Sequence, residues 1–364
     1  MNGSAPYQHA VIEVIEQEAP SMPQDGRRPS HQRGKGRGEL CFRTPGGLQA
    51  QYPAVVGPDE HHRADGPFRR RTVRLAEGWE VVQRRLPREA ATAEASDLLE
   101  REIRGALVVF RAYQDSRHAV LFPMLAGYDL DADEPFVLYP ERSFTPLPSL
   151  AGSASLDQQR GIGRDLVLMV RLLEGVGLVH RGLSPATLGW ENGRIRLLDL
   201  SGQARVGRPR TPFGQPPWAS PEQRAGVGDA DARDALWSVA QLMYYLLYGR
   251  PGDADGMAPE FGEDRTVAPV LAPAFAPRAE QRPRPGALLP LLACPDPFQL
   301  DPPLPDPLDP GRQEFDRQLA TKRRDLGLPP PAMVVPNRQR GAGAAGGGRR
   351  GRWPFGGSRG RGAR

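Results

Sequence analysis

Lysine is almost absent from this chain of 364 residues. Of its 48 basic residues, only Lys35 and Lys322 are lysines and the others are arginines. Together with 42 glycines and 40 prolines, which exceed ordinary usage, this composition is typical of a GC-rich bacterial genome. An arginine cluster in this chain is therefore weak evidence for a binding surface unless aromatic or acidic partners accompany it.

Cysteine is scarce too. Cys41 and Cys294 provide no disulfide framework and do not have the spacing of metal ligands. The first 20 residues lack the basic start and apolar core of a secretory signal. The longest apolar runs are too short or too interrupted by charge to cross a bilayer. These absences predict a cytoplasmic protein with no membrane span.

The positive charge is concentrated at the C-terminal end. Residues 337–364 carry eight arginines and no acidic residue, so the rest of the chain has 40 basic and 43 acidic residues and is mildly acidic. With Trp353 and Phe355, this Arg/Gly composition is typical of segments that bind single-stranded nucleic acid. Two alternatives remain open. The segment could contact an acidic partner or an anionic lipid, or it could be a flexible extension whose composition reflects codon usage.

The distribution of proline, glycine and charge predicts five segments. They are a disordered basic N-terminal segment (1–37), a sheet-rich region (38–140), a helical region (141–295), a Pro-rich linker with a short helix (296–336) and a disordered Arg/Gly-rich tail (337–364).

Secondary-structure signals support the two central regions. Ser155 and Gln158 have the spacing of a capping box, which predicts a helix that runs to about Gly175. A second apolar helix is expected over 235–248, and Gly249 follows it as a stop signal. In the first region, the patterns predict strands over 79–86, 119–125 and 135–139 and a helix over 90–110.

A series of short motifs occupies the second half of the chain. The stretch Leu178-Val-His-Arg-Gly-Leu-Ser-Pro-Ala-Thr-Leu188 is followed by Asp199-Leu-Ser, Ser220-Pro-Glu, Trp237-Ser and Arg282-Pro. In this order and spacing, residues 78–295 resemble the eukaryotic-type (bacterial) serine/threonine protein kinase family, as a degenerate member similar to a pseudokinase. The resemblance implies an α+β, bilobal protein-kinase-like fold. A small sheet-rich N-lobe would lie within 38–140, poorly matched before 78, and a larger helical C-lobe within 141–295.

The catalytic positions that the resemblance implies have lost functional groups. His180, Arg181 and Gly182 stand where the family has His-Arg-Asp, whose Asp orients the acceptor hydroxyl and takes its proton. Gly182 has no side chain with which to do this. Thr187 replaces the Asn that binds a second Mg²⁺, and a hydroxyl is a poorer ligand than an amide oxygen.

The nucleotide-binding positions are altered as well. Arg84 stands at the lysine that contacts the ATP phosphates, with Arg85 as the alternative, and a guanidinium differs from an ammonium in size and geometry. Glu102 is its expected partner, with Glu100 as competitor. Asp199 is kept and could ligate one Mg²⁺. No Gly-rich phosphate-covering loop precedes Arg84, so we expect binding of ATP and Mg²⁺ to be weak or absent.

Residues with structural roles in the family are retained. The resemblance implies a buried ion pair between Glu222 and Arg282 and structural roles for His180 and Trp237. The family's Asp two positions before this tryptophan is absent, because Asp234 stands one position too early. This shift leaves the bracing of the catalytic loop in question.

Three functions remain open. The first is a catalytically impaired pseudokinase that acts as a regulatory or scaffolding module for a protein partner, with weak ATP binding. The second is an active atypical serine/threonine protein kinase that transfers the γ-phosphate of ATP to protein. The third is an adaptor tethered to nucleic acid through residues 337–364.

Overall fold

The computed structural model describes residues 37–60 and 66–299, together with 317, 318, 320–322, 324 and 325. The chain divides into two units, Met1–Gln299 and Leu300–Arg364. In the second unit, the described residues are helical and fall within the short helix expected in the linker. The disorder predicted for 1–37 and 337–364 lies outside the described residues, except that Arg37 begins a strand.

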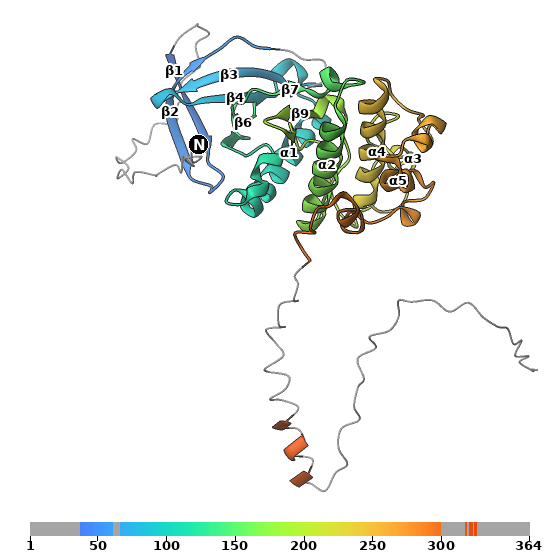
Figure 1. Cartoon of the computed structure of the whole chain (residues 1–364). Coiled ribbons are helices and arrows are strands. Elements are labelled where there is room, and N and C mark those ends of the chain that lie inside the picture. The colour runs from blue at the N-terminus through green and yellow to red at the C-terminus, as the bar shows by residue number, and fades with distance from the viewer. Residues whose placement is uncertain (1–36, 61–65, 300–316, 319, 323, 326–364) are drawn as a thin grey trace, which may run out of the picture. The chain divides into compact units, whose positions relative to one another are not determined.

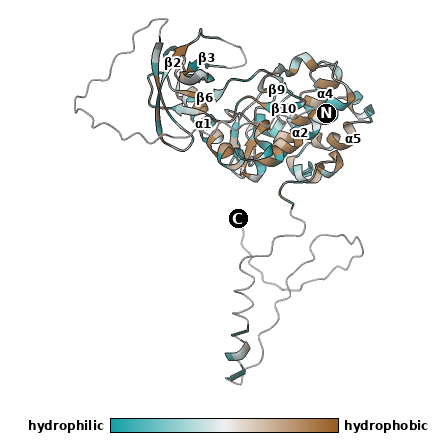
Figure 2. Cartoon of the chain, turned by 60° about the vertical axis from the view of Figure 1, so that its left-hand side comes forward, coloured by the Kyte–Doolittle hydropathy of each residue, from teal (hydrophilic) through white to brown (hydrophobic). Residues whose placement is uncertain are grey.

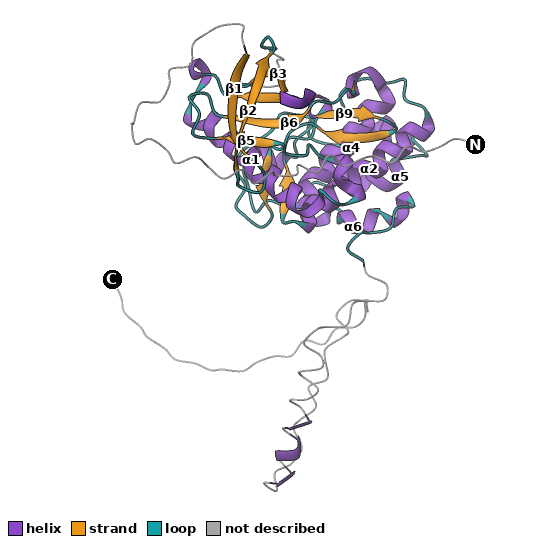
Figure 3. Cartoon of the chain, turned by 90° about the vertical axis from the view of Figure 1, so that its left-hand side faces the viewer, coloured by secondary structure: helices purple, strands orange, loops and turns teal. Residues whose placement is uncertain are grey.

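Six antiparallel strands of the first unit close into a barrel in the order β1-β2-β3-β4-β6-β5 (Figures 1 and 3). Their bounds are β1 (Arg37–Arg43), β2 (Gln49–Val56), β3 (Arg69–Leu75), β4 (Glu80–Arg85), β5 (Gly127–Asp129) and β6 (Phe136–Pro140). The barrel closes where Arg43 of β1 pairs with Tyr128 of β5. Gly127 permits this approach, because a Cβ there would lie only 2.3 Å from the Phe42 ring.

This closed barrel contradicts the predicted bilobal protein-kinase-like fold. We expected a small, sheet-rich N-lobe, poorly matched before residue 78, and a separate larger lobe of helices. Instead β1 and β2 belong to a six-stranded antiparallel barrel, and helices are mixed with further short strands in the rest of the unit. The periodicity of a strand shows which side chains face inward, but it does not show that β1 will pair with a strand as distant in sequence as β5.

Helix α1 (Ala93–Tyr113) packs beside the barrel and contacts β6. It begins after Thr92, whose hydroxyl accepts a hydrogen bond from the Ala95 N–H at 3.1 Å. Leu99 and Ile103 are buried on one face, at the helical spacing that predicted this element. The helix therefore has a fixed position against the sheet.

Two long helices, α2 (Leu156–Gly175) and α4 (Ala232–Tyr248), pack on each other in the main core. The capping box of Ser155 and Gln158 is confirmed at the start of α2. Trp237 of α4 is fully buried. Figure 2 shows hydrophobic residues in brown along these helices, as expected for the centre of a core.

Shorter elements complete the unit. The strands are β7 (Thr145–Pro146), β8 (Leu178–His180), β9 (Leu188–Glu191), β10 (Arg194–Leu197) and β11 (Gln203–Arg205). They form a sheet of order β10-β9-β7 and a pair of β11 with β8. The helices are α3 (Pro221–Ala225), α5 (Ala268–Leu271) and α6 (Pro285–Leu288). Single 3₁₀ turns cover Ala76–Gly78, Arg88–Ala90, Arg117–Leu121, Leu147–Leu150, Pro185–Thr187, Pro259–Glu263, Ala272–Phe275, Ala279–Gln281 and Pro290–Leu292.

The strand predicted over 119–125 is wrong. Residues 117–121 form a 3₁₀ turn, which Ser116 caps by accepting a hydrogen bond from the His118 N–H. Leu121 and Phe122 are both fully buried although they are adjacent in sequence, so this apolar run does not alternate between two faces. Among the described helices, none has the length and apolar character required to cross a membrane.

Candidate functional site

A buried ion pair joins the barrel to helix α1. Arg84 of β4 donates from Nη1 to Oε2 of Glu102, and their side chains are only 4 % and 0 % exposed. The second carboxylate oxygen of Glu102 accepts a hydrogen bond from the Tyr139 hydroxyl at 3.0 Å. The Arg84 guanidinium also lies over the Phe68 ring, 4.1 Å from its centroid. Arg84 therefore has a fixed position against α1.

The two alternatives for this pair have other partners. Arg85 points to the other side of β4 and forms ion pairs with Asp59 and Glu134. Glu100 pairs with Arg104 one helical turn later, on the exposed face of α1. The structure therefore brings together Arg84 and Glu102, as the expected pairing required.

Asp199 lies close to this pair, immediately after β10. It is buried, and its Oδ1 accepts hydrogen bonds from the Ser201 N–H at 3.1 Å and the Ser201 hydroxyl at 2.9 Å. Burial alone would raise the pKa of Asp199, but the charge of Arg84 and the hydrogen bonds from Ser201 hold it below its usual value. Burial raises the pKa of Glu102 to about 7 against the effect of Arg84, and the charge of Asp199 contributes to the rise. The three groups form one electrostatic cluster.

The loop after β8 is held by its own side chains. His180 Nε2 lies 3.2 Å from the Asp199 carbonyl oxygen, and the Gly182 N–H donates to His180 Nδ1 at 3.3 Å. The His180 ring is therefore neutral, with its proton on Nε2, and burial lowers its pKa accordingly. The Thr187 hydroxyl accepts from the Ser184 N–H at 3.0 Å and lies 3.1 Å from the Gly182 carbonyl oxygen. Thr187 thus stabilises the loop.

Gly182 has room for a side chain. A Cβ at this position would meet the Phe213 ring at 3.4 Å and the His180 ring at 3.7 Å, which are ordinary contacts. The backbone of Gly182 also lies outside the positive-φ region that favours glycine. The surrounding structure therefore does not require glycine at position 182, and an aspartate would fit there.

Arg181 contacts the segment that follows β11 and holds it in place. Its Nη1 donates to the Thr211 hydroxyl at 2.9 Å, and its Nε donates to the Gly202 carbonyl at 3.2 Å. The guanidinium lies 4.5 Å from the centroid of the Phe213 ring. Burial lowers the pKa of Arg181 to about 10, which still leaves the group charged at neutral pH.

The structural pair expected from the sequence forms. Arg282 Nη2 donates to Glu222 Oε2 at 2.9 Å, and Nη1 lies 2.8 Å from Oε1, which gives a two-point contact. The Arg282 guanidinium lies 5.0 Å from the centroid of the Trp237 ring. Trp237 in turn donates from Nε1 to the Pro217 carbonyl at 2.9 Å. These contacts join α3, α4 and the segment before α6.

Sequence reasoning did not identify Gln223 as part of the site. Its Nε2 donates to the Arg181 carbonyl at 2.6 Å and to the Phe213 carbonyl at 3.0 Å, so it braces the loop at 181–182. Asp234, which stands one position before the Asp that braces this loop in the kinase family, instead accepts two hydrogen bonds from Arg210. The only signal in the sequence for Gln223 is its position next to Glu222.

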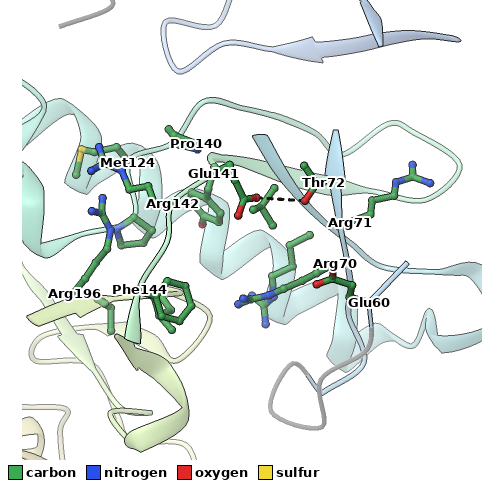
Figure 4. Close-up of a pocket in the computed structure, with 16 residues that line it drawn as sticks. Glu60, Arg70, Arg71, Thr72, Met124, Pro140, Glu141, Arg142, Phe144 and Arg196 are labelled. Carbon is green, nitrogen blue, oxygen red and sulfur yellow. Dashed lines mark hydrogen bonds between the residues drawn. The ribbon is translucent and has the colours of Figure 1, made fainter. Parts of the chain in front are cut away.

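A cavity of about 240 Å³ opens beside the cluster (Figure 4). Arg84 and Tyr139 line it together with apolar and charged residues from β3, β4, β10 and the segment after β6. The other lining residues are Glu60, Arg70, Arg71, Thr72, Val82, Pro123, Met124, Pro140, Glu141, Arg142, Phe144, Arg196, Leu197 and Leu198.

Two consecutive positions at one edge of the cavity offer no N–H group to a ligand. Pro140 has no N–H, and the Glu141 N–H already donates to the Glu80 carbonyl at 3.0 Å. The Glu141 carboxylate accepts from the Thr72 hydroxyl at 3.4 Å, as Figure 4 shows. The Glu141 N–H and the Thr72 hydroxyl therefore already have partners in the chain.

In the cluster, Asp199 is the carboxylate that could contact a magnesium ion. Among the described residues, no three or more His, Cys, Asp or Glu side chains form a group able to hold a metal ion. Glu102 is bound by Arg84 and Tyr139, and the Thr187 hydroxyl is used within its own loop. Asp199 would have to supply the protein's carboxylate contact alone.

Comparison with known proteins gives a partial match. No family model matches the chain. Over 93 residues the chain is 38 % identical to a putative CBL-interacting protein kinase 27 of Oryza sativa subsp. japonica. This match covers 24 % of the chain and 23 % of the rice protein, so the chain spans about a quarter of that relative's length. The comparison hints at a relation to protein kinases over one part of the chain.

Proposed function

We propose that this protein is a kinase-like module that has lost phosphoryl transfer and serves as a regulatory or scaffolding element in signalling for a protein partner. The observation that carries the proposal is that the loop at 180–187 is held by hydrogen bonds although it lacks the carboxylate that kinases have at position 182. His180, Arg181, Thr187 and Gln223 hold the loop in place, while Gly182 offers no group to accept a proton. The partial match to a kinase supports the kinase-like part of the proposal.

The nearby carboxylates are poor substitutes for the missing one. A general base must lie within hydrogen-bond reach of the proton that it removes. Glu102 has a pKa of about 7, which suits such a role, but its side chain is 0 % exposed and is bound by Arg84 and Tyr139. Asp199 is bound by Ser201 and is the candidate for a metal contact. Because both carboxylates already have partners, the alternative of an active atypical kinase is less well supported.

Weak nucleotide binding is part of the proposal. The cavity of about 240 Å³ lies below the ~300–1,000 Å³ typical of ligand sites. Arg84 lines the cavity, but its guanidinium lies over the Phe68 ring and differs in size and geometry from the lysine of the kinase motif. ATP is therefore expected as a weak ligand with little dependence on Mg²⁺.

The setting of the protein is also proposed. Cys41 and Cys294 are both free thiols, which suits the reducing cytoplasm of a bacterium. The alternative of a nucleic-acid adaptor depends on residues 337–364, which lie outside the described residues. No observation in the described part of the chain favours that alternative over a protein partner.

Phosphoryl transfer tests the proposal directly. Purified protein is incubated with γ-labelled ATP, Mg²⁺ and a generic protein substrate, and Asp199→Asn serves as the control. We expect the unaltered chain and this variant to give the same background label. Transfer by the unaltered chain that Asp199→Asn abolishes would overturn the proposal.

A further inference from the structure

The ring of Phe144 lies against the backbone of Gly189. Phe144 precedes β7, and Pro146 of β7 pairs with Gly189 of β9. A Cβ built on Gly189 would lie 2.7 Å from Cδ2 and 2.8 Å from Cγ of Phe144. Any residue other than glycine at position 189 would therefore displace the ring, so the two residues are matched to each other.

The same ring forms part of the cavity wall. Figure 4 shows Phe144 between Arg196 and Arg70. With Leu197 and Leu198, it contributes apolar surface to a cavity that is otherwise lined by many charged side chains. The ring thus occupies space that would otherwise enlarge the cavity from about 240 Å³.

Phe144 can leave this position without opening the core. It is half-buried, and its neighbours Arg142, Ser143, Thr145 and Pro146 are exposed. The next fully buried side chain along the chain is Leu147. Displacement or truncation of the ring therefore affects the cavity much more than the packing of α2 and α4.

We infer that Phe144 is the residue that sets the size of ligand this cavity accepts. With the ring on Gly189, the cavity excludes a ligand as large as a purine nucleotide or binds it weakly. With the ring removed, a planar heterocycle stacks on the exposed Gly189 backbone between the apolar side chains of the wall. This inference rests on the proposed function, because it gives the physical reason for weak nucleotide binding.

The experiment measures ATP affinity by titration calorimetry, without Mg²⁺, for the full chain and for Phe144→Leu and Phe144→Ala. Leucine keeps an apolar side chain on Gly189 but removes the ring. We expect affinity to rise from the unaltered chain to the leucine variant and again to the alanine variant, by about tenfold or more in total, equivalent to one logarithmic unit in Kd.

Phe298→Ala is the matched control. Like Phe144, Phe298 is partly exposed and its ring lies against a glycine. A Cβ built on Gly175 would lie 2.1 Å from this ring. Phe298 does not line the cavity. We expect this variant to bind ATP like the unaltered chain. Equal affinity of all four proteins, or the same gain in the control, would overturn the inference. If Phe144→Ala does not fold, the leucine variant alone decides by the same comparison.

The two proposals can fail separately. Label transfer that depends on Asp199 would overturn the loss of catalysis and leave the role of Phe144 intact. Unchanged ATP affinity in both Phe144 variants would overturn that role and leave the loss of catalysis intact.

Discussion

Arg210 binds Asp234 at two points, from Nε to Oδ2 at 2.9 Å and from Nη2 to Oδ1 at 3.0 Å. Their side chains are 4 % and 0 % exposed. This pair ties the segment after β11 to the first turn of α4, and Asp234 lies 3.8 Å from Arg282 as well. The segment from Pro209 to Thr211 is therefore held against the core.

Removing one member of this pair is expected to destabilise the protein strongly. Arg210→Met leaves the Asp234 carboxylate buried without its main partner, which typically costs about 3–5 kcal/mol. Urea unfolding measures the loss, and Arg208→Met, at an exposed neighbouring position, is the control. A loss in Arg210→Met no greater than in the control would show that the pair does not hold this segment.

Glycine-to-alanine changes in two helices are expected to differ in sign. Gly161 of α2 has no atom within 4 Å of a built Cβ, so Gly161→Ala should stabilise the protein by about 0.5–1 kcal/mol through helix propensity. In Gly105→Ala of α1, the new Cβ would lie 2.9 Å from Cγ of Gln203. Gln203 would then lose its hydrogen bond to the Arg101 carbonyl, 2.9 Å in the structure.

We therefore expect Gly105→Ala to lower the thermal midpoint while Gly161→Ala raises it. Differential scanning calorimetry of both variants checks this. An equal rise in both would mean that Gln203 gives way to the new methyl group without loss, and that its contact with α1 has little importance.

The raised pKa of Glu102 predicts a pH dependence of stability. Burial raises this pKa from 4.5 to about 7, so between these values the folded protein holds a proton that the unfolded chain releases. The free energy of unfolding should accordingly fall as pH rises from 4.5 to 7, by an amount on the order of a few kcal/mol.

Two variants of α1 test this dependence. Glu102→Gln cannot titrate and should flatten the decline, whereas Glu100→Gln, which alters an exposed pair on the same helix, should leave it unchanged. Chemical unfolding at several pH values measures both. Parallel profiles for the unaltered chain and Glu102→Gln would contradict the assignment.

Restoring the carboxylate tests the catalytic interpretation from the opposite side. Gly182→Asp should fold normally, because the new Cβ makes an ordinary contact of 3.4 Å with Phe213. A positioned acid or base contributes about 10²–10⁴-fold to rate, so we expect label transfer above that of the unaltered chain. Gly182→Ala is the control and should stay at background.

A second outcome would also overturn the catalytic interpretation. The unaltered chain would have to transfer phosphate at the ~1–100 s⁻¹ of ordinary kinases, and Gly182→Asp would have to bring no gain. Circular dichroism of each variant separates lost activity from lost structure.

Local signals in the sequence predicted the local structure of the main core. The capping box of Ser155 and Gln158 fixed the start of α2, and the apolar run over 235–248 lies within α4. The pairing of Glu222 with Arg282 followed from the kinase-like motifs, and the structure brings the two side chains together. These predictions depended on short-range patterns or on motifs of fixed order.

Other contacts between distant segments had no such motif and could not be predicted. The pairing of Arg43 with Tyr128 closes the barrel, and it contradicted the expected fold. The contacts of Gln223 with the Arg181 carbonyl and of Phe144 with Gly189 likewise join segments far apart in the chain. A side chain that binds a backbone carbonyl requires no particular partner residue type, so it leaves no motif in the sequence.

The way in which the barrel closes also affects how this protein can recruit another chain. An open sheet presents a row of unpaired amide and carbonyl groups to which an incoming peptide can add as a further strand. Among the described residues, β1 pairs with β5 only at Arg43 and Tyr128, so its residues 37–42 pair on one side only, with β2. An added strand would therefore pair along this part of β1, whereas the closure at Arg43 blocks the end of the strand.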